Sequence, residues 1–184
     1  MPTHVALLRG INVGGRNRVP MPELKALMAE LGHAGVATYI QSGNAVFTST
    51  EKDPAQLADQ LEQAIADRLN VSCGVVVITK DELQQVIDDN PFPGEDNPKA
   101  LHAVFRRAEL TADERAKVAQ AAEKARAKGS QDEAVIVGRT MFLHTPDGLG
   151  RSELSAQLAR TAASKTGTAR NWATVHKLRS MLDG

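Results

Sequence analysis

The chain has 184 residues, of which 42% are hydrophobic and only 3% aromatic, so its core is predicted to be aliphatic. No apolar run approaches the ~20 residues of a membrane-spanning helix, and the N-terminus lacks the pattern of a secretory signal. A single cysteine, Cys73, excludes an internal disulfide framework, so we expect a cytoplasmic protein. The net charge is zero, which argues against a protein that coats nucleic acids without sequence specificity.

The first part of the chain alternates strand and helix patterns in the order β-α-β-β-α-β. The predicted elements are a strand at 4–9, a helix at 22–31, a hairpin of strands at 36–41 and 44–49, a helix from Asp53-Pro54 to about Leu69 and a strand at 73–78. This order predicts a ferredoxin-like split β-α-β half over residues 1–79.

A short helix and a proline-rich linker are predicted over residues 80–98, and a second half begins at residue 99. Its predicted elements are a strand at 100–106, a helix at 111–128, a hairpin of strands at 134–137 and 140–144, a helix at 153–162, a break at 165–169 and a helix from Asn171 to about Leu182. A helix thus stands where the fourth strand belongs. We therefore expect an α+β fold of two consecutive ferredoxin-like halves, the second incomplete and ending in helices.

The most informative stretch is residues 8–18, which directly follows the first predicted strand. It holds three arginines, two asparagines and three glycines but no acid. Arginine and asparagine supply donors for oxyanions, and glycines bring backbone N–H groups close to a ligand. The spacing from Gly10 to Arg16 resembles a phosphate-binding P-loop, but that loop needs a lysine where Arg16 stands, and Pro20 and Pro22 delay the helix that should follow.

The predicted topology brings this stretch to a second polar segment. In a split β-α-β unit the third strand lies antiparallel between the first two, so the end of the first strand meets the turn of the hairpin. We therefore expect a binding site for an anionic ligand at one sheet edge, closed over by residues from the far end of the chain. Its candidate residues are Arg9, Asn12, Gly14, Gly15, Gln41, Ser42, Asn44, Arg151, Arg170 and Asn171.

Each candidate also has a purely structural interpretation. The glycines and Gln41–Asn44 can simply form turns, Ser152 can cap a helix beside Arg151, and Trp172 can belong to the core. The five histidines lack metal-ligand spacing, so no metal or cofactor is predicted, and only His144 is retained as an acid–base candidate. Catalytic residues stay unassigned.

Four motifs resemble a bacterial family known as domain of unknown function 1697. They are Val5–Gly15 (VALLRGINVGG), Thr38–Asn44 (TYIQSGN), Gly150-Arg151-Ser152, and Thr168–Val175 (TARNWATV), which together span almost the whole chain. The family commonly has asparagine at the position of Ala173. The resemblance implies a two-part α/β fold in a bacterial cytoplasmic protein and implies no activity.

Three functions therefore stay open. The leading hypothesis is binding of a phosphate-bearing ligand, either a nucleotide or a nucleic acid, at the arginine, asparagine and glycine cluster. The second is an enzyme that acts on a phosphorylated or carboxylated small molecule in the same pocket, which needs a titrating group. The third is a structural or oligomeric scaffold, in which the cluster serves loop bonding only.

Overall fold

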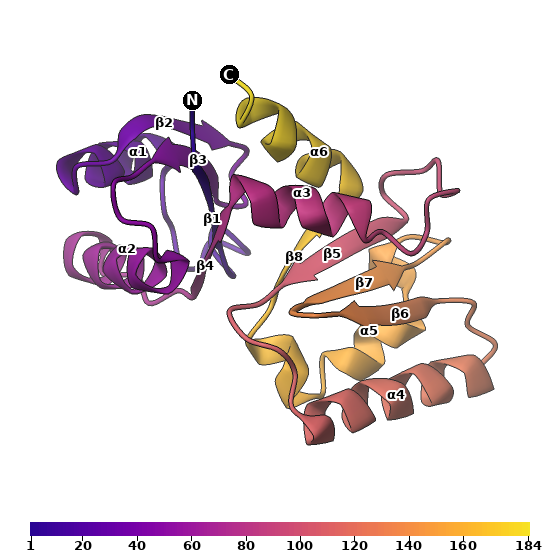
Figure 1. Cartoon of the computed structure of the whole chain (residues 1–184). Helices are drawn as coiled ribbons and strands as arrows, with labels where there is room; N and C mark the ends of the chain where they lie inside the picture. The colour runs from indigo at the N-terminus through magenta and orange to yellow at the C-terminus, as the bar shows by residue number, and fades with distance from the viewer. The chain divides into compact units, whose positions relative to one another are not determined.

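The computed structural model describes all 184 residues, and the chain divides into two compact units (Figure 1). The first unit comprises Met1–Gln85 with His176–Gly184, and the second comprises Val86–Val175. Each unit contains one four-stranded antiparallel sheet, and the strand orders are β2-β3-β1-β4 and β6-β7-β5-β8. Both orders are those of a ferredoxin-like unit, so the prediction of two such halves is confirmed.

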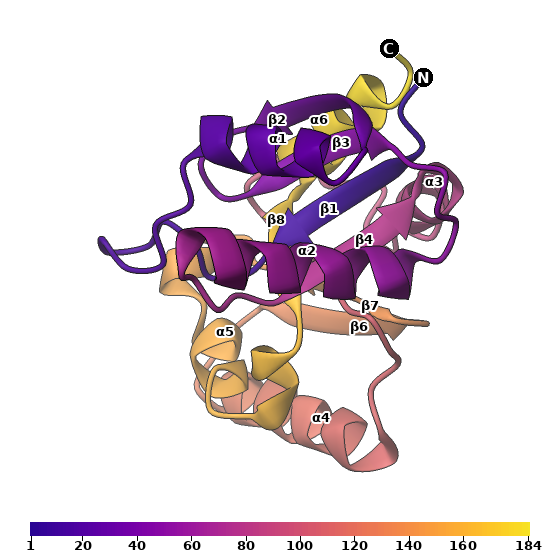
Figure 2. The same cartoon turned by 90° about the vertical axis from the view of Figure 1, so that its left-hand side faces the viewer.

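The first sheet carries its two long helices on one face (Figure 2). The elements are β1 (His4–Leu8), α1 (Met21–Glu30), β2 (Ala34–Tyr39), β3 (Asn44–Thr48), α2 (Pro54–Leu69), β4 (Val75–Thr79) and α3 (Lys80–Asp88). Alternate residues of the strands, such as Ala6, Leu8 and Phe47, pack with Leu24 and Leu61 of the helices in one aliphatic core. All five residues of β1 are buried, as expected for a central strand.

The second sheet is complete, which corrects the expectation that this half lacks its fourth strand. Its elements are β5 (Leu101–Phe105), α4 (Ala112–Ala127), β6 (Glu133–Val137), β7 (Thr140–His144), the 3-10 turn η1 (Leu149–Arg151), α5 (Glu153–Leu158), the 3-10 turn η2 (Ala162–Lys165), β8 (Thr168–Asn171) and α6 (Trp172–Met181). Figure 1 shows α4 and α5 on one face of this sheet, where they enclose a second core around Val104, Leu143 and Leu154.

Strand β8 was missed because its four residues, Thr-Ala-Arg-Asn, are mostly poor β-formers in a stretch that shows no apolar alternation. The neighbouring strand decides its conformation: β8 pairs antiparallel with β5, with Ala103 opposite Arg170 and Phe105 opposite Thr168. The helix cap expected at Asn171 does form, since its Oδ1 accepts a hydrogen bond from Thr174 N at 2.9 Å.

The ends of the elements mostly follow local signals in the sequence. Capping boxes form at Thr79–Glu82 and at Thr111–Glu114, each with reciprocal side-chain and backbone hydrogen bonds, as these short sequence patterns favour. None of the helices combines the length and the apolar character that crossing a lipid bilayer requires.

The last helix contributes to the first unit, whereas the boundaries drawn from the sequence place it with the second half. Lys80 Nζ lies 2.8 Å from the Asp183 carboxylate, and Arg179 Nε donates to Gln84 Oε1 at 2.6 Å. Arg179 and Lys80 hold the pKa of Asp183 at about 2. These polar contacts attach the C-terminal residues to α3, and sequence periodicity carries no information about them.

Two buried histidines flank Phe47 in the first unit. The ring of His4 stacks on Phe47 with centroids 5.6 Å apart, and the ring of His33 lies 4.8 Å from the same phenyl group. The Nε2 atoms of both histidines are buried without a hydrogen-bond partner. Burial lowers the pKa of each imidazole, and the repulsion that two protonated rings would exert lowers the pKa of His33 further. Both rings are therefore neutral in the folded protein at neutral pH.

The stability of the first unit should consequently fall in mild acid. Below the ordinary histidine pKa of 6.5 the unfolded chain binds protons that the folded chain excludes, so stabilisation present above this pH is lost as the pH falls toward the folded pKa values. We expect the free energy of unfolding, measured by urea denaturation from about pH 7.5 to about pH 5.5, to depend less on pH in the His4→Leu/His33→Leu variant. The exposed His176→Leu variant is the control and should retain the pH dependence of the parent; equal dependence in all three proteins would contradict the prediction.

Candidate functional site

The end of β1 and the β2–β3 turn meet at one edge of the first sheet, as the topology predicts. Leu7 pairs with Asn44, and Leu8 N donates to Gly43 O at 2.8 Å. On the other side of β1, Arg9 N donates to Gly74 O at 2.8 Å. The residues that follow, Gly10–Val19, form a loop that we call the arginine loop.

Asn12 holds the arginine loop in place through all the hydrogen-bonding groups of its amide. Its Nδ2 donates to Val19 O at 2.9 Å and to Gln41 O at 2.8 Å, and its Oδ1 accepts from Val19 N at 2.9 Å. One side chain thus closes the base of the loop and ties it to the β2–β3 turn. Asn12 itself has the left-handed backbone conformation that asparagine tolerates, with φ of 54°. Its amide therefore positions the loop rather than offering donors to a ligand.

The tip of the arginine loop is a tight reversal from Val13 to Arg16. Arg16 N donates to Val13 O at 3.0 Å, and the central residues Gly14 and Gly15 have φ of 57° and 74°. Positive φ at both central positions defines a type I′ turn, which glycine adopts without strain. Asn17 Nδ2 donates to Gly10 O at 3.1 Å, so the tip is fastened at a second point. Hydrogen bonds within the chain thus hold the loop at its base and near its tip, although the tip itself is exposed.

Arg16 and Arg18 are exposed on this loop, and no ion pair or side-chain hydrogen bond engages either guanidinium. Arg9, by contrast, is half-buried and has partners within the chain. Of the two exposed arginines, neither was among the candidate site residues chosen from the sequence. The acid-free run that contains all three was the available signal, but sequence alone does not tell which arginine faces solvent.

The β2–β3 turn lies beside the arginine loop and exposes Gln41 and Ser42. Ile40 is 50% exposed and has φ of 50°, an unfavourable conformation for a β-branched residue. Asn44 is fully buried, and its Nδ2 donates to Tyr39 O at 2.9 Å and Ser42 Oγ at 3.1 Å. Asn44, like Asn12, therefore shapes the turn.

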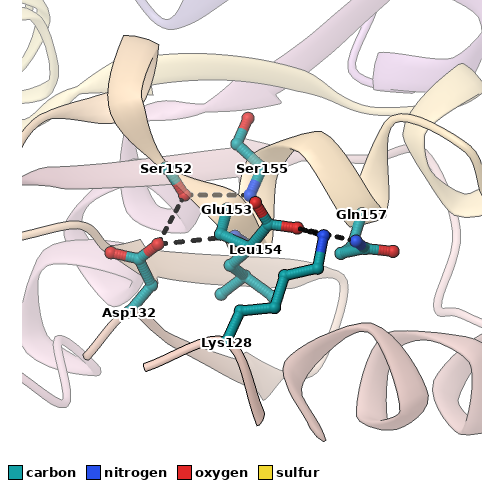
Figure 3. Close-up of polar contacts among 7 residues, drawn as sticks. All are labelled: Lys128, Asp132, Ser152, Glu153, Leu154, Ser155 and Gln157. Atoms are coloured by element: carbon teal, nitrogen blue, oxygen red, sulfur yellow. Dashed lines mark hydrogen bonds and ion pairs between the residues drawn. The ribbon is translucent and has the colours of Figure 1, made fainter. Parts of the chain in front are cut away.

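The segment around Arg151 belongs to the second unit. There the carboxylate of Asp132 lies at the start of α5, where an external anion could otherwise bind (Figure 3). Ser152 caps α5, since its Oγ accepts from Ser155 N at 2.9 Å and donates to Asp132 Oδ2 at 2.8 Å. The same carboxylate oxygen accepts from Leu154 N at 3.4 Å. Asp132 thus accepts hydrogen bonds at the start of this helix, where an external anion would otherwise find its donors. Arg151 is exposed, and its side chain has no partner.

Arg170 and Asn171 are structural members of the second unit. Arg170 is 7% exposed, and its Nη1 donates to Thr168 Oγ1 at 2.7 Å and to Ala169 O at 2.9 Å. Burial lowers the pKa of its guanidinium to about 10. Trp172 is buried against Phe142, with ring centroids 6.2 Å apart, which confirms its assignment to the core. Arg170 and Asn171 therefore have structural roles within the second unit.

His144, the acid–base candidate, is engaged by the segment predicted as a linker. Its Nε2 lies 2.6 Å from Glu95 Oε2, and Phe92 stacks on its ring with centroids 4.8 Å apart. The contact with His144 lowers the pKa of Glu95. The proline-rich segment is thus fastened to β7, and the contact with Glu95 gives His144 a structural role. Burial raises the pKa of the Cys73 thiol to about 11, which makes it a poor nucleophile at neutral pH.

The chain is thus an α+β protein of two ferredoxin-like units, with an acid-free arginine loop at one sheet edge of the first. The chain belongs to the family described as protein of unknown function DUF1697, whose model matches residues 1–142. The matched span contains the first two of the four motifs, and the two later motifs lie beyond it.

A solved structure, that of the conserved bacterial protein SP0830 from Streptococcus pneumoniae, resembles the whole chain. The TM-score is 0.75, the sequence identity is 24%, and the similarity covers 98% of each chain. At this identity the likeness shows a shared fold. Comparison with curated proteins gives no match.

Proposed function

We propose that the arginine loop and the adjoining β2–β3 turn bind a phosphate-bearing ligand, either a nucleotide or a nucleic acid. The observation that carries this proposal is the state of Arg16 and Arg18: both are exposed on a loop fixed by Asn12 and Asn17, and no group of the chain neutralises them. Guanidinium groups form bidentate hydrogen bonds with phosphate oxygens, and a stiff loop loses little conformational entropy when it binds.

The surroundings of the two arginines favour an oxyanion as well. Residues 1–22 contain no acid that would repel one. The exposed N–H groups of Gly14 and Gly15 have no partner within the chain, so they are available as further donors. Val13, 66% exposed, and Ile40 add apolar surface for the sugar or base of a nucleotide. Gln41 and Ser42 supply neutral polar groups at the same sheet edge.

The test measures binding of a fluorescein-labelled single-stranded 12-mer RNA, and of the matching DNA, by fluorescence anisotropy at several salt concentrations. We expect Arg16→Ala/Arg18→Ala to weaken binding roughly 10- to 100-fold. The slope of log K against log salt should shrink by about 1.4, because each phosphate contact contributes about 0.7 for a single strand. Competition with a mononucleotide and with inorganic phosphate separates a nucleotide site from a nucleic-acid site.

The matched control is Arg126→Ala/Arg160→Ala, which removes the same charge from two exposed arginines of the second unit. It should leave both the affinity and the salt slope close to those of the parent protein. Equal losses in the two double variants would mean that binding follows net charge alone and would overturn the proposal. So would the absence of binding to all four probes.

A further inference from the structure

The second unit contains an apolar pocket with a buried arginine in its wall, apart from the arginine loop. The pocket has a volume of about 160 Å³ and lies between the sheet and the α5–η2 segment. Val104, Met141 and Leu158 in its wall are buried, whereas Ala159 and Ala169 are exposed. The pocket therefore has an apolar interior and a rim that reaches solvent.

The polar groups of this pocket are few. Arg106 lines it with an exposed fraction of only 3%, and Ser155 and Ser164 contribute hydroxyl groups. Arg106 Nη1 donates to Ala163 O and, at 2.8 Å, to Thr166 Oγ1, which fixes the guanidinium in the wall. Ser164 Oγ donates to Thr161 O at 2.8 Å, whereas no hydrogen bond engages Ser155 Oγ. Ligand sites commonly combine apolar walls with a few fixed polar groups of this kind.

Size and charge define the ligand. An engineered apolar cavity of about 150 Å³ in another protein holds a benzene molecule, so this pocket fits an apolar body of about that size. A fixed guanidinium at low dielectric favours a carboxylate over a neutral group. We propose that this pocket binds a small monocarboxylate with a compact apolar body, oriented by Arg106 and by the hydroxyl of Ser155.

Local backbone geometry supports the assignment of Arg106 to the pocket wall. A Cβ atom on Gly167 would lie 3.1 Å from Arg106 Cζ and 2.5 Å from Val104 Cγ1. Glycine at this position therefore lets the backbone approach both a wall residue and the guanidinium. A buried cation beside an apolar space that opens to solvent is an arrangement typical of ligand sites.

The experiment titrates the full-length protein with benzoate, benzamide and acetate, following 15N–1H chemical shifts of residues around the pocket. Benzoate has both the apolar ring and the negative charge, benzamide has only the ring, and acetate has only the charge. We expect benzoate to bind about tenfold or more tightly than either of the others. Benzoate no tighter than benzamide would overturn the proposal, as would the absence of shifts with millimolar benzoate.

A pocket-filling variant provides the second test, since Arg106 also fastens the η2 segment and its replacement risks misfolding. Ser155→Leu places a larger apolar side chain in the pocket and should weaken benzoate binding about tenfold or more. Ala156→Leu, the neighbouring exposed position on α5, should leave binding within about twofold. Unchanged binding in Ser155→Leu would refute the site. Arg16→Ala/Arg18→Ala should bind benzoate normally, so this inference and the proposed function fail separately.

Discussion

Replacing Gly43 with alanine should destabilise the first unit by about 3 kcal/mol or more, through overpacking combined with backbone strain. The new Cβ atom would lie 2.8 Å from Leu8 Cβ and 2.7 Å from Ile11 Cδ1. The Leu8 atom is fixed by the central strand β1, so it cannot move aside as the end of a flexible side chain can. Gly43 also has φ of 88°, which alanine adopts only with strain.

The control for Gly43→Ala is Gly10→Ala, which separates the two causes. Gly10 also has positive φ, 63°, but no atom lies within 4 Å of its added Cβ. This variant should therefore lose only the strain term, about 1 kcal/mol. Urea denaturation followed by far-UV circular dichroism measures both variants. Equal losses at the two positions would show that the contact with Leu8 does not determine the requirement for glycine at residue 43.

Gly167→Ala should destabilise the second unit by about 2 kcal/mol or more, and here overpacking acts alone. The added Cβ would lie 2.5 Å from Val104 Cγ1 and 3.1 Å from Arg106 Cζ. The branched side chain of valine restricts its rotamers, and Val104 is buried among core residues, so its methyl group cannot move aside freely. The emission of Trp172, the single tryptophan, reports unfolding of this unit.

The control for Gly167→Ala is Gly150→Ala. Gly150, like Gly167, does not have positive φ, and no atom lies within 4 Å of its added Cβ. We expect a change within about 0.5 kcal/mol at this exposed position. A midpoint of urea denaturation that shifts equally in both variants would refute the steric explanation.

The sequence predicts which two segments of the candidate site lie side by side, but it does not show which of their side chains hold the backbone. The split β-α-β topology predicts that the arginine loop meets Gln41–Asn44, and the hydrogen bond from Asn12 to Gln41 O joins the two segments. Asn12 and Asn44, however, were proposed as ligand contacts, and their amides are engaged with the backbone. An asparagine in a glycine-rich loop looks the same in sequence whether it binds a ligand or holds the loop.

The second unit shows the same division between local and tertiary information. Ser152 was correctly predicted to cap α5, because capping depends on adjacent residues. The carboxylate that completes this cap comes from Asp132, 20 residues earlier, and no local pattern links the two. The pocket beside Arg106 was also not predicted, since β5, β7, α5 and η2 must all pack before it exists.

Apolar periodicity and capping chemistry act over a few residues, so the sequence alone predicts the helices and strands of the first half and, except for β8, those of the second. It also located the acid-free segment that carries Arg16 and Arg18. That Thr168–Asn171 is a strand follows from tertiary packing, because the backbone of β5 supplies the hydrogen bonds that these weak β-formers do not favour locally. The same holds for which arginines face solvent and which are buried, since burial depends on contacts between segments distant in the chain.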